Sequence, residues 1–342
     1  MKRRAFLGAT SAGIGMSSLI APLMAQQSGD NLRQTKMGIA ATSFMMAWKP
    51  KDTYDFLEHC HALGAAGIQA PINGDLQKIR SRIEKLGMYI EGMIELPHTR
   101  DISAFERDVQ KASTVGAVAL RSACLGTRRY ETFSSLTDWQ NFVAQSHNSL
   151  EAALPILDRY KIPLGLENHK DWTVDEMVAL IKKYSSEYLG VCLDFGNNIS
   201  LLDEPYDLVQ KLAPYTVSTH LKNMGVEHST DGFLLSEVVL DRGFLDMPRM
   251  LAVVQQARPK TRFSLEMITR DPLHVPCLTD KYWTTFPDRN GRYLARTLML
   301  VHKAQSSQPL PRVAQLSHDS QVHLEEENVV SCIRYARETL NL

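Results

Sequence analysis

From Met37 to Ala304 the chain alternates short, continuously apolar runs with longer amphipathic segments, and the alternation occurs eight times. Apolar runs of this kind are typical of strands buried on both faces, as in a parallel sheet. The longer segments have the pattern of helices that cover such a sheet. Eight units predict a closed (β/α)8 TIM barrel, which needs about 250 residues. No GxGxxG motif follows the first run, which argues against a dinucleotide-binding fold.

The predicted elements divide the chain into a barrel and an extension. Strands are expected at residues 37–42, 67–72, 88–96, 117–124, 163–168, 189–195, 216–222 and 262–267. Helices are expected at residues 53–63, 75–86, 102–115, 136–160, 174–184, 205–212, about 247–257 and 289–304. The barrel then covers residues 37–305, and residues 306–342 form a C-terminal extension. An amphipathic pattern at residues 323–340 predicts a helix packed on the barrel, with a contact in a homo-oligomer as the alternative. We interpret the acidic run at 325–327 as a solvated helix face.

The N-terminus has the layout of an export signal. Residues 2–7 read Lys-Arg-Arg-Ala-Phe-Leu, and a moderately apolar stretch rich in Gly, Ala and Ser follows. The paired arginines resemble a twin-arginine signal, so we assign residues 1–25 to a signal peptide and residues 26–36 to a linker. A membrane anchor is the alternative, but glycines and Pro22 interrupt the stretch. The signal predicts a partner, the twin-arginine export machinery, and a periplasmic or exported location.

Charge and cysteine content narrow the classes of function. Lys plus Arg and Asp plus Glu are equal at 38 each, so no basic excess indicates a nucleic-acid partner. Five cysteines are scattered without a CxxC motif. Neither a zinc finger nor a disulfide scaffold is expected from this spacing.

Four consecutive predicted strands each end in a group that could bind a metal. These groups are Glu167, Asp194, His220 and Glu266. Barrel enzymes carry their chemistry at the carboxyl ends of the strands, where these side chains would converge. A buried carboxylate is costly unless it is paired or bound to a cation. One divalent ion resolves all four, and oxygen and nitrogen ligands suit Mn²⁺, Co²⁺, Mg²⁺ or Zn²⁺. Taken singly, each residue could instead be a salt-bridge partner or a core histidine.

The strand ends Leu-Glu-Asn-His, Cys-Leu-Asp-Phe-Gly-Asn, Thr-His-Leu-Lys-Asn and Leu-Glu-Met resemble the sugar phosphate isomerase/epimerase family. This family belongs to the xylose isomerase-like TIM barrel superfamily and includes the D-tagatose 3-epimerase group. The resemblance implies that Glu167 and Glu266 also move protons and that Arg242 binds substrate. Many relatives carry a histidine where this chain has Asn197. That difference, with the absence of a later Asp-x-His, argues against the DNA-repair endonucleases of the superfamily.

Further polar and aromatic residues are candidates for substrate binding. Asn197 follows the sixth strand, and His169 and Lys222 each lie two residues beyond a predicted ligand, on the same face of their strands. Lys222 would stabilise an enolate oxygen or bind a carboxylate or phosphate, or it faces solvent. Trp48 and Trp172 would stack on a sugar, or they serve packing.

The predicted function is a metal-dependent sugar isomerase or epimerase that transfers protons next to a carbonyl of a ketose or keto-sugar. A metal-dependent lyase that acts on 3-keto-glycosides by β-elimination shares the first step and is the first alternative. A non-catalytic sugar-binding barrel is the second. All three imply a small sugar or glycoside as the partner.

Overall fold

Apolar strands that pair in parallel form the centre of the computed structural model, which describes residues 34–98, 101–306 and 308–342. The strands are β1 (Met37–Ala40), β2 (Gly67–Ala70), β3 (Tyr89–Met93), β4 (Ala119–Ser122), β5 (Leu164–Glu167), β6 (Leu189–Asp194), β7 (Thr216–His220) and β10 (Phe263–Leu265). Their order in the sheet is β10-β1-β2-β3-β4-β5-β6-β7. A parallel bridge from Leu221 to Leu265 joins the two ends of the sheet. The predicted TIM barrel is therefore confirmed.

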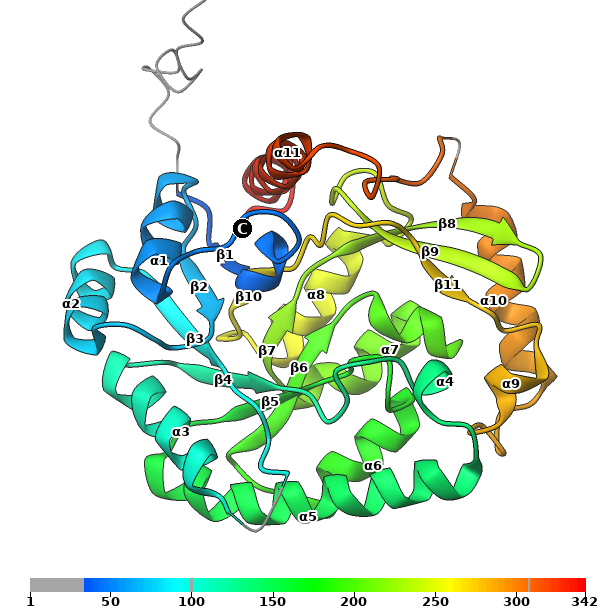
Figure 1. The fold of residues 1–342 in the computed structure, drawn as a ribbon, viewed down its shortest axis with the longest axis horizontal. Coiled ribbons are helices and arrows are strands. Elements are labelled where there is room, and N and C mark those ends of the chain that lie inside the picture. The colour runs from blue at the N-terminus through cyan, green and yellow to red at the C-terminus, as the bar shows by residue number, and fades with distance from the viewer. Residues whose placement is uncertain (1–33, 99–100, 307) are drawn as a thin grey trace, which may run out of the picture. The chain divides into compact units, whose positions relative to one another are not determined.

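Helices surround this ring of strands (Figure 1). They are α1 (Thr53–Ala62), α2 (Leu76–Leu86), α3 (Ser103–Val115), α5 (Leu136–Tyr160), α6 (Val174–Tyr184), α7 (Pro205–Leu212), α8 (Met247–Ala257) and α10 (Gly291–Ala304). Shorter elements are α4 (Arg129–Thr132), α9 (Asp280–Trp283), η2 (Ala41–Phe44), η3 (Asn197–Leu201) and η4 (Ala213–Tyr215). Helices α5, α6, α7 and α8 have the predicted bounds, whereas the strands are shorter than predicted.

Local chemistry explains why α6 begins just beyond the end of β5. Thr173 caps the helix by accepting a hydrogen bond from the backbone N–H of Glu176, whose side chain accepts from the N–H of Thr173 in return. This capping box satisfies two helix N–H groups that would otherwise lack partners. It fixes the turn that follows the first predicted metal ligand.

The predicted signal peptide at residues 1–25, and the predicted linker up to residue 33, lie outside the described residues. Within the part of the chain that the structure describes, no helix has both the length and the apolar character to cross a membrane.

A small antiparallel sheet stands beside the barrel and was not predicted from the sequence. Its strands are β8 (Asn223–Ser229), β9 (Gly232–Val238) and β11 (Leu273–Val275), in the order β11-β9-β8. The β8–β9 hairpin follows β7 directly, and β11 comes from the loop after β10 (Figure 1). The sheet therefore joins two of the loops that follow metal-ligand strands.

The C-terminal extension contains the helix α11 (His318–Glu338), which packs on the barrel beside η2. Val329 is buried in this contact. The prediction that the whole acidic run faces solvent is wrong, because Glu325 is fully buried. Its carboxylate accepts hydrogen bonds from the backbone N–H groups of residues 46, 47 and 48 at 2.9–3.0 Å. Glu326 pairs with His59 at 3.0 Å, and Glu327 is exposed. The helix thus secures the loop after β1, while its role in a homo-oligomer stays a prediction.

We expect Glu325→Ala to lower the free energy of unfolding by about 2–3 kcal/mol, since three backbone donors would lose their acceptor. Urea unfolding followed by circular dichroism measures this effect. The matched control is Glu327→Ala, which should change stability by less than about 0.5 kcal/mol because the side chain is exposed. Equal stability of the two variants would contradict the role assigned to Glu325.

Candidate metal centre

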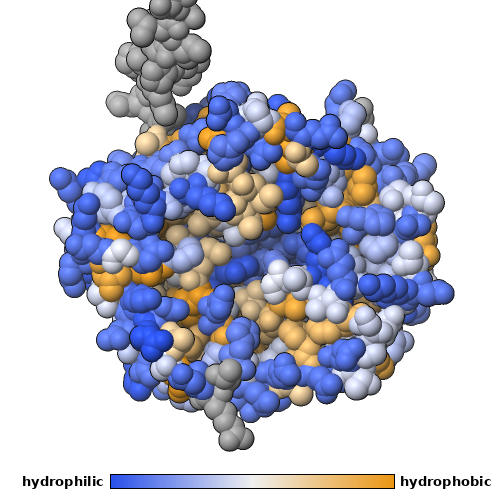
Figure 2. Space-filling view, in the orientation of Figure 1, coloured by the Kyte–Doolittle hydropathy of each residue, from blue (hydrophilic) through white to orange (hydrophobic). Residues whose placement is uncertain are grey.

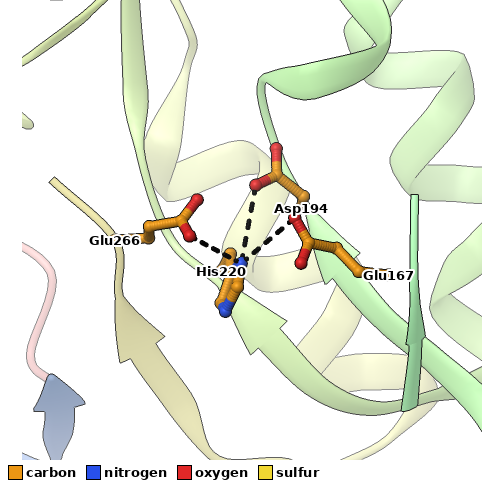
Figure 3. Close-up of side chains that lie close together, drawn as sticks. All are labelled: Glu167, Asp194, His220 and Glu266. Atoms are coloured by element: carbon orange, nitrogen blue, oxygen red, sulfur yellow. Dashed lines mark ion pairs between the residues drawn. The ribbon is translucent and has the colours of Figure 1, made fainter. Parts of the chain in front are cut away.

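Parallel strands place the four predicted ligands at one end of the barrel. Glu167, Asp194 and His220 are the last residues of β5, β6 and β7, and Glu266 directly follows β10. All four side chains are buried, and one ligand atom from each lies within 4.8 Å of the others. Figure 3 shows the three carboxylates turned toward the imidazole of His220, with Glu167 and Glu266 on opposite sides. The structure therefore brings these four residues together.

Three carboxylate oxygens lie close to one ring nitrogen of His220. Its Nδ1 atom lies 3.3 Å from Glu266 Oε1, 3.4 Å from Glu167 Oε1 and 3.8 Å from Asp194 Oδ2. Nδ1 nevertheless has no hydrogen-bond partner among the described residues. Burial opposes a charge on the ring, but the carboxylates of Glu266 and Glu167 raise the pKa of His220 to about 9. The surroundings of Nδ1 thus favour a positive charge.

A second layer of polar residues fixes the tautomer of the imidazole. His220 Nε2 lies 2.5 Å from Gln69 Oε1. The amide nitrogen of Gln69 donates to Glu91 Oε2 at 2.8 Å and to Ser218 Oγ at 3.0 Å, which orients its oxygen toward His220. Nε2 therefore carries a hydrogen whether or not the ring is charged, and Nδ1 is the nitrogen that faces the three carboxylates. Burial raises the pKa of Glu91, against the hydrogen bonds from Gln69 and Ser218.

This donor set fits a divalent metal ion. Three carboxylate oxygens in a buried space repel one another unless positive charge lies between them, supplied by a proton on Nδ1 or by a metal ion that replaces it. Imidazole nitrogen and carboxylate oxygen are the ligands of zinc, manganese, cobalt and magnesium sites. A hydrogen bond to the far nitrogen is the usual support for a metal-binding histidine, and Gln69 provides it. Glu167, Asp194, His220 and Glu266 are the residues that would hold the ion.

Each carboxylate is also oriented by a neighbour of its own. Glu167 pairs with Arg121 on β4. Asp194 Oδ1 accepts hydrogen bonds from the N–H groups of Gly196 and Asn197 at 2.9 and 2.7 Å, and Oδ2 faces the centre and Lys222. Glu266 Oε1 accepts from Thr42 Oγ1 at 2.8 Å. These contacts fix the rotamers of the three acids.

Burial raises the pKa of Glu167, but the charges of Arg121 and His220 outweigh it and leave that pKa well below its usual value. The pKa of Glu266 is also well below its usual value. Burial raises this pKa, but the charges of His220 and Lys222 outweigh that effect. For Asp194 burial prevails over the charge of Lys222, and the pKa is raised. Two ionised glutamates therefore flank the centre, and their negative charges suit the binding of a cation.

Basic side chains gather next to the acids. Lys222 is buried and pairs with Glu266, with Asp194 Oδ2 at 2.8 Å and with Glu237 at 3.8 Å. Glu237, on β9, also pairs with Arg270 at 2.6 Å. Lys170 is buried as well and donates to Asn197 Oδ1. The alternative that Lys222 faces solvent is thus wrong.

The other predicted substrate-binding residues fall into two groups. Asn197 is buried at the start of η3 and donates to Glu167 Oε1 at 2.9 Å. His169 is half-buried, with Nδ1 2.8 Å from the backbone oxygen of Leu125, and burial lowers its pKa to about 4 despite the charge of Glu167. Both therefore lie beside the centre.

The second group of predicted substrate-binding residues lies outside the four-residue cluster of Glu167, Asp194, His220 and Glu266. It consists of Arg242, Trp48 and Trp172. Arg242 is exposed, and its charge acts on Cys332 of α11. Trp48 packs against His59, with ring centroids 4.4 Å apart, under α11. Trp172 packs against Trp139 of α5 at 5.4 Å. Both tryptophans thus pack against neighbouring rings, and stacking on a sugar stays a prediction.

Several residues of the site were missed by sequence reasoning. Gln69, Glu91 and Arg121 lie inside apolar strand runs, so a polar group within a buried strand was the available signal. Glu237 lies in the unpredicted hairpin and gave no signal.

Viewed in the orientation of Figure 1, the molecule is hollowed near the middle of the ring of strands, and hydrophilic side chains gather in the hollow (Figure 2).

Comparison with known proteins agrees with this geometry. The family model described as xylose isomerase-like TIM barrel matches residues 54–284. A 3-oxo-isoapionate decarboxylase from Pectobacterium atrosepticum is 31% identical over 199 residues, which cover 58% of this chain. The match spans 66% of that relative, just under two thirds of its length.

Solved structures share the fold at low sequence identity. The IolI protein with a bound zinc atom has a TM-score of 0.56 and 11% identity, and the match covers 88% of this chain and 99% of that one. A D-tagatose 3-epimerase-like protein has a TM-score of 0.52 and 11% identity, and the match covers 79% of this chain and 99% of that one. These likenesses concern the fold alone.

Replacing Gln69 by Leu should weaken the binding of a divalent ion about 10–100-fold, because His220 would lose the acceptor that orients its ring. Isothermal titration calorimetry of the metal-free protein with Mn²⁺ measures the affinity for the ion. The exposed Gln77→Leu provides the matched control, and circular dichroism shows whether both variants fold. An unchanged affinity in folded Gln69→Leu would rule out this role.

Proposed function

Since the chain belongs to the xylose isomerase-like TIM barrel family, we propose that it is a divalent-metal-dependent sugar isomerase or epimerase. Its substrate would be a ketose or keto-sugar, and its reaction a proton transfer next to the carbonyl. The observation that carries the proposal is the buried imidazole nitrogen that faces three carboxylates. The metal-binding and sugar-isomerising proteins with this fold support it.

When bound, a divalent ion supplies Lewis-acid polarisation of a carbonyl and a neighbouring hydroxyl. The chain's own residues would do the rest. Glu167 and Glu266 flank the centre from opposite sides (Figure 3), so one can remove the proton next to the carbonyl and the other can return it on the opposite face. Return to the same carbon gives an epimer, and return to the neighbouring carbon gives an aldose–ketose isomerisation. The ammonium group of Lys222 would stabilise negative charge on the enolate oxygen.

A lyase that acts on 3-keto-glycosides by β-elimination is the second candidate. It shares proton removal next to the carbonyl and differs only in that the carbanion expels a leaving group. Asn197 favours it, because an amide that donates to Glu167 and accepts from Lys170 cannot take part in a second proton transfer. The decarboxylase relative also supports carbanion chemistry, since loss of CO₂ from a 3-oxo acid leaves an enolate. A non-catalytic sugar-binding barrel is less favoured, because binding alone does not require three buried carboxylates.

Metal content and proton exchange test the proposal together. We expect about one divalent ion per wild-type chain and exchange of the substrate's α-proton in deuterated water when ketoses and 3-keto-glycosides are screened. Glu167→Gln/Glu266→Gln should lose both, since two of the four ligands and both bases are changed. Glu84→Gln/Glu131→Gln removes two exposed carboxylates and should lose neither.

An absence of bound metal in the wild type, even after reconstitution, would refute the proposal. Metal bound without any exchange would instead support the sugar-binding alternative. Release of the aglycone from a 3-keto-glycoside would identify the lyase.

We also propose export through the twin-arginine route, on the strength of the N-terminal sequence. Arg3→Lys/Arg4→Lys should leave the protein in the cytoplasm of a bacterial host, whereas the wild type should reach the periplasm. Cell fractionation and immunoblotting measure the distribution, and Lys2→Ala is the control that keeps both arginines. Equal export of the wild type and the double variant would contradict this route.

A further inference from the structure

Lys170 is a buried lysine next to the metal centre, three residues beyond Glu167. Its side chain is only 4% exposed, and its backbone adopts a left-handed conformation with φ of 67°. This conformation is unfavourable for a side chain with a Cβ atom, so surrounding contacts must hold it. The carbonyl of Lys170 accepts the N–H of Arg129 at 3.0 Å, at the start of α4. The fold thus secures an ammonium group at this place.

Among the described residues no ion pair includes Lys170, whereas Arg121, Lys222 and Arg270 each pair with a carboxylate. The carboxylates of Glu237 and Asp194 favour its charge only from beyond ion-pair distance. Its acceptor is the amide oxygen of Asn197. Burial and the nearby charges of Lys222 and Arg270 lower the pKa of Lys170 to about 8. A buried charge without a counterion is costly, which indicates that a partner comes from outside the chain.

A second cation approaches the same atom. Lys222 Nζ lies 3.5 Å from Asn197 Oδ1, so the two ammonium groups converge on one oxygen. The nitrogen of the same amide donates to Glu167 Oε1 at 2.9 Å. One side-chain amide therefore separates Lys170 from a metal ligand. Any anion that Lys170 binds must lie close to the reacting carbons.

We propose that Lys170, assisted by Lys222, binds a carboxylate of the substrate, so that the substrates of this enzyme are sugar acids or keto acids derived from them. The inference rests on the proposed function, which supplies the metal ion. A carboxylate suits the site because it can be attached directly to a reacting carbon. A phosphate ester at the far end of a sugar would place its charge away from the carbon that reacts.

Calorimetry with two matched probes tests this proposal on the metal-loaded full chain. D-Gluconate and D-glucitol differ only in that one has a carboxylate where the other has a hydroxymethyl group. We expect the wild type to bind gluconate at least tenfold more tightly than glucitol. Lys170→Met should lose at least tenfold in gluconate affinity and none in glucitol affinity. Lys170→Arg should retain most of the preference, and Lys183→Met, at an exposed position of α6, should behave as the wild type.

Metal content is measured for every variant, so that weak binding due to loss of the ion is recognised. Three results would overturn the proposal: equal affinity for both probes, an equal loss for both in Lys170→Met, or no gluconate binding by the metal-loaded wild type. Tighter binding of D-glucitol 6-phosphate than of gluconate would show that the anion is a phosphate and would overturn it too. Failure of the proposed function looks different, since the chain would then hold no divalent ion or exchange no proton with any keto-sugar.

Discussion

Repulsion among buried carboxylates is the constraint on which the rest of this site depends. Parallel strands bring Glu167, Asp194 and Glu266 to one end of the barrel, where little water can screen them. The imidazole of His220 turns its Nδ1 atom toward the same space because its Nε2 atom is hydrogen-bonded to Gln69. Such a group is stable only with positive charge at its centre. A divalent ion would meet that requirement and would provide the carbonyl polarisation that the proposed reaction needs.

The neighbouring residues extend this electrostatic arrangement outward. Arg121 and Lys222 hold the outer oxygens of the two glutamates, and Glu237 holds Arg270. Asn197 links the acids to the cations, since its amide nitrogen donates to Glu167 and its oxygen accepts from Lys170. Because an amide does not ionise near neutral pH, Asn197 is a fixed connection between the metal centre and a cation and does not carry a proton.

Sequence reasoning located what depends on strand periodicity. The continuous apolar runs predicted the barrel. A charged residue or histidine at the end of each of four runs predicted the buried four-residue group, because the carboxyl ends of parallel strands meet at one end of the barrel. It failed where contacts come from distant parts of the chain. Glu325 looked like one member of a solvated acidic run until the fold placed three backbone N–H groups against it. Glu237 belongs to a hairpin whose position depends on pairing with a strand from another loop.

The most direct measurement of the central claim is anomalous diffraction at the manganese edge from crystals of the protein loaded with Mn²⁺. The account predicts a single strong anomalous peak. It should lie about 2.0–2.6 Å from carboxylate oxygens of Glu167, Asp194 and Glu266 and from His220 Nδ1. The ammonium group of Lys222 should then lie farther from Asp194 than the 2.8 Å seen here. A crystal with no peak among these four side chains, or with a peak elsewhere, would contradict the account.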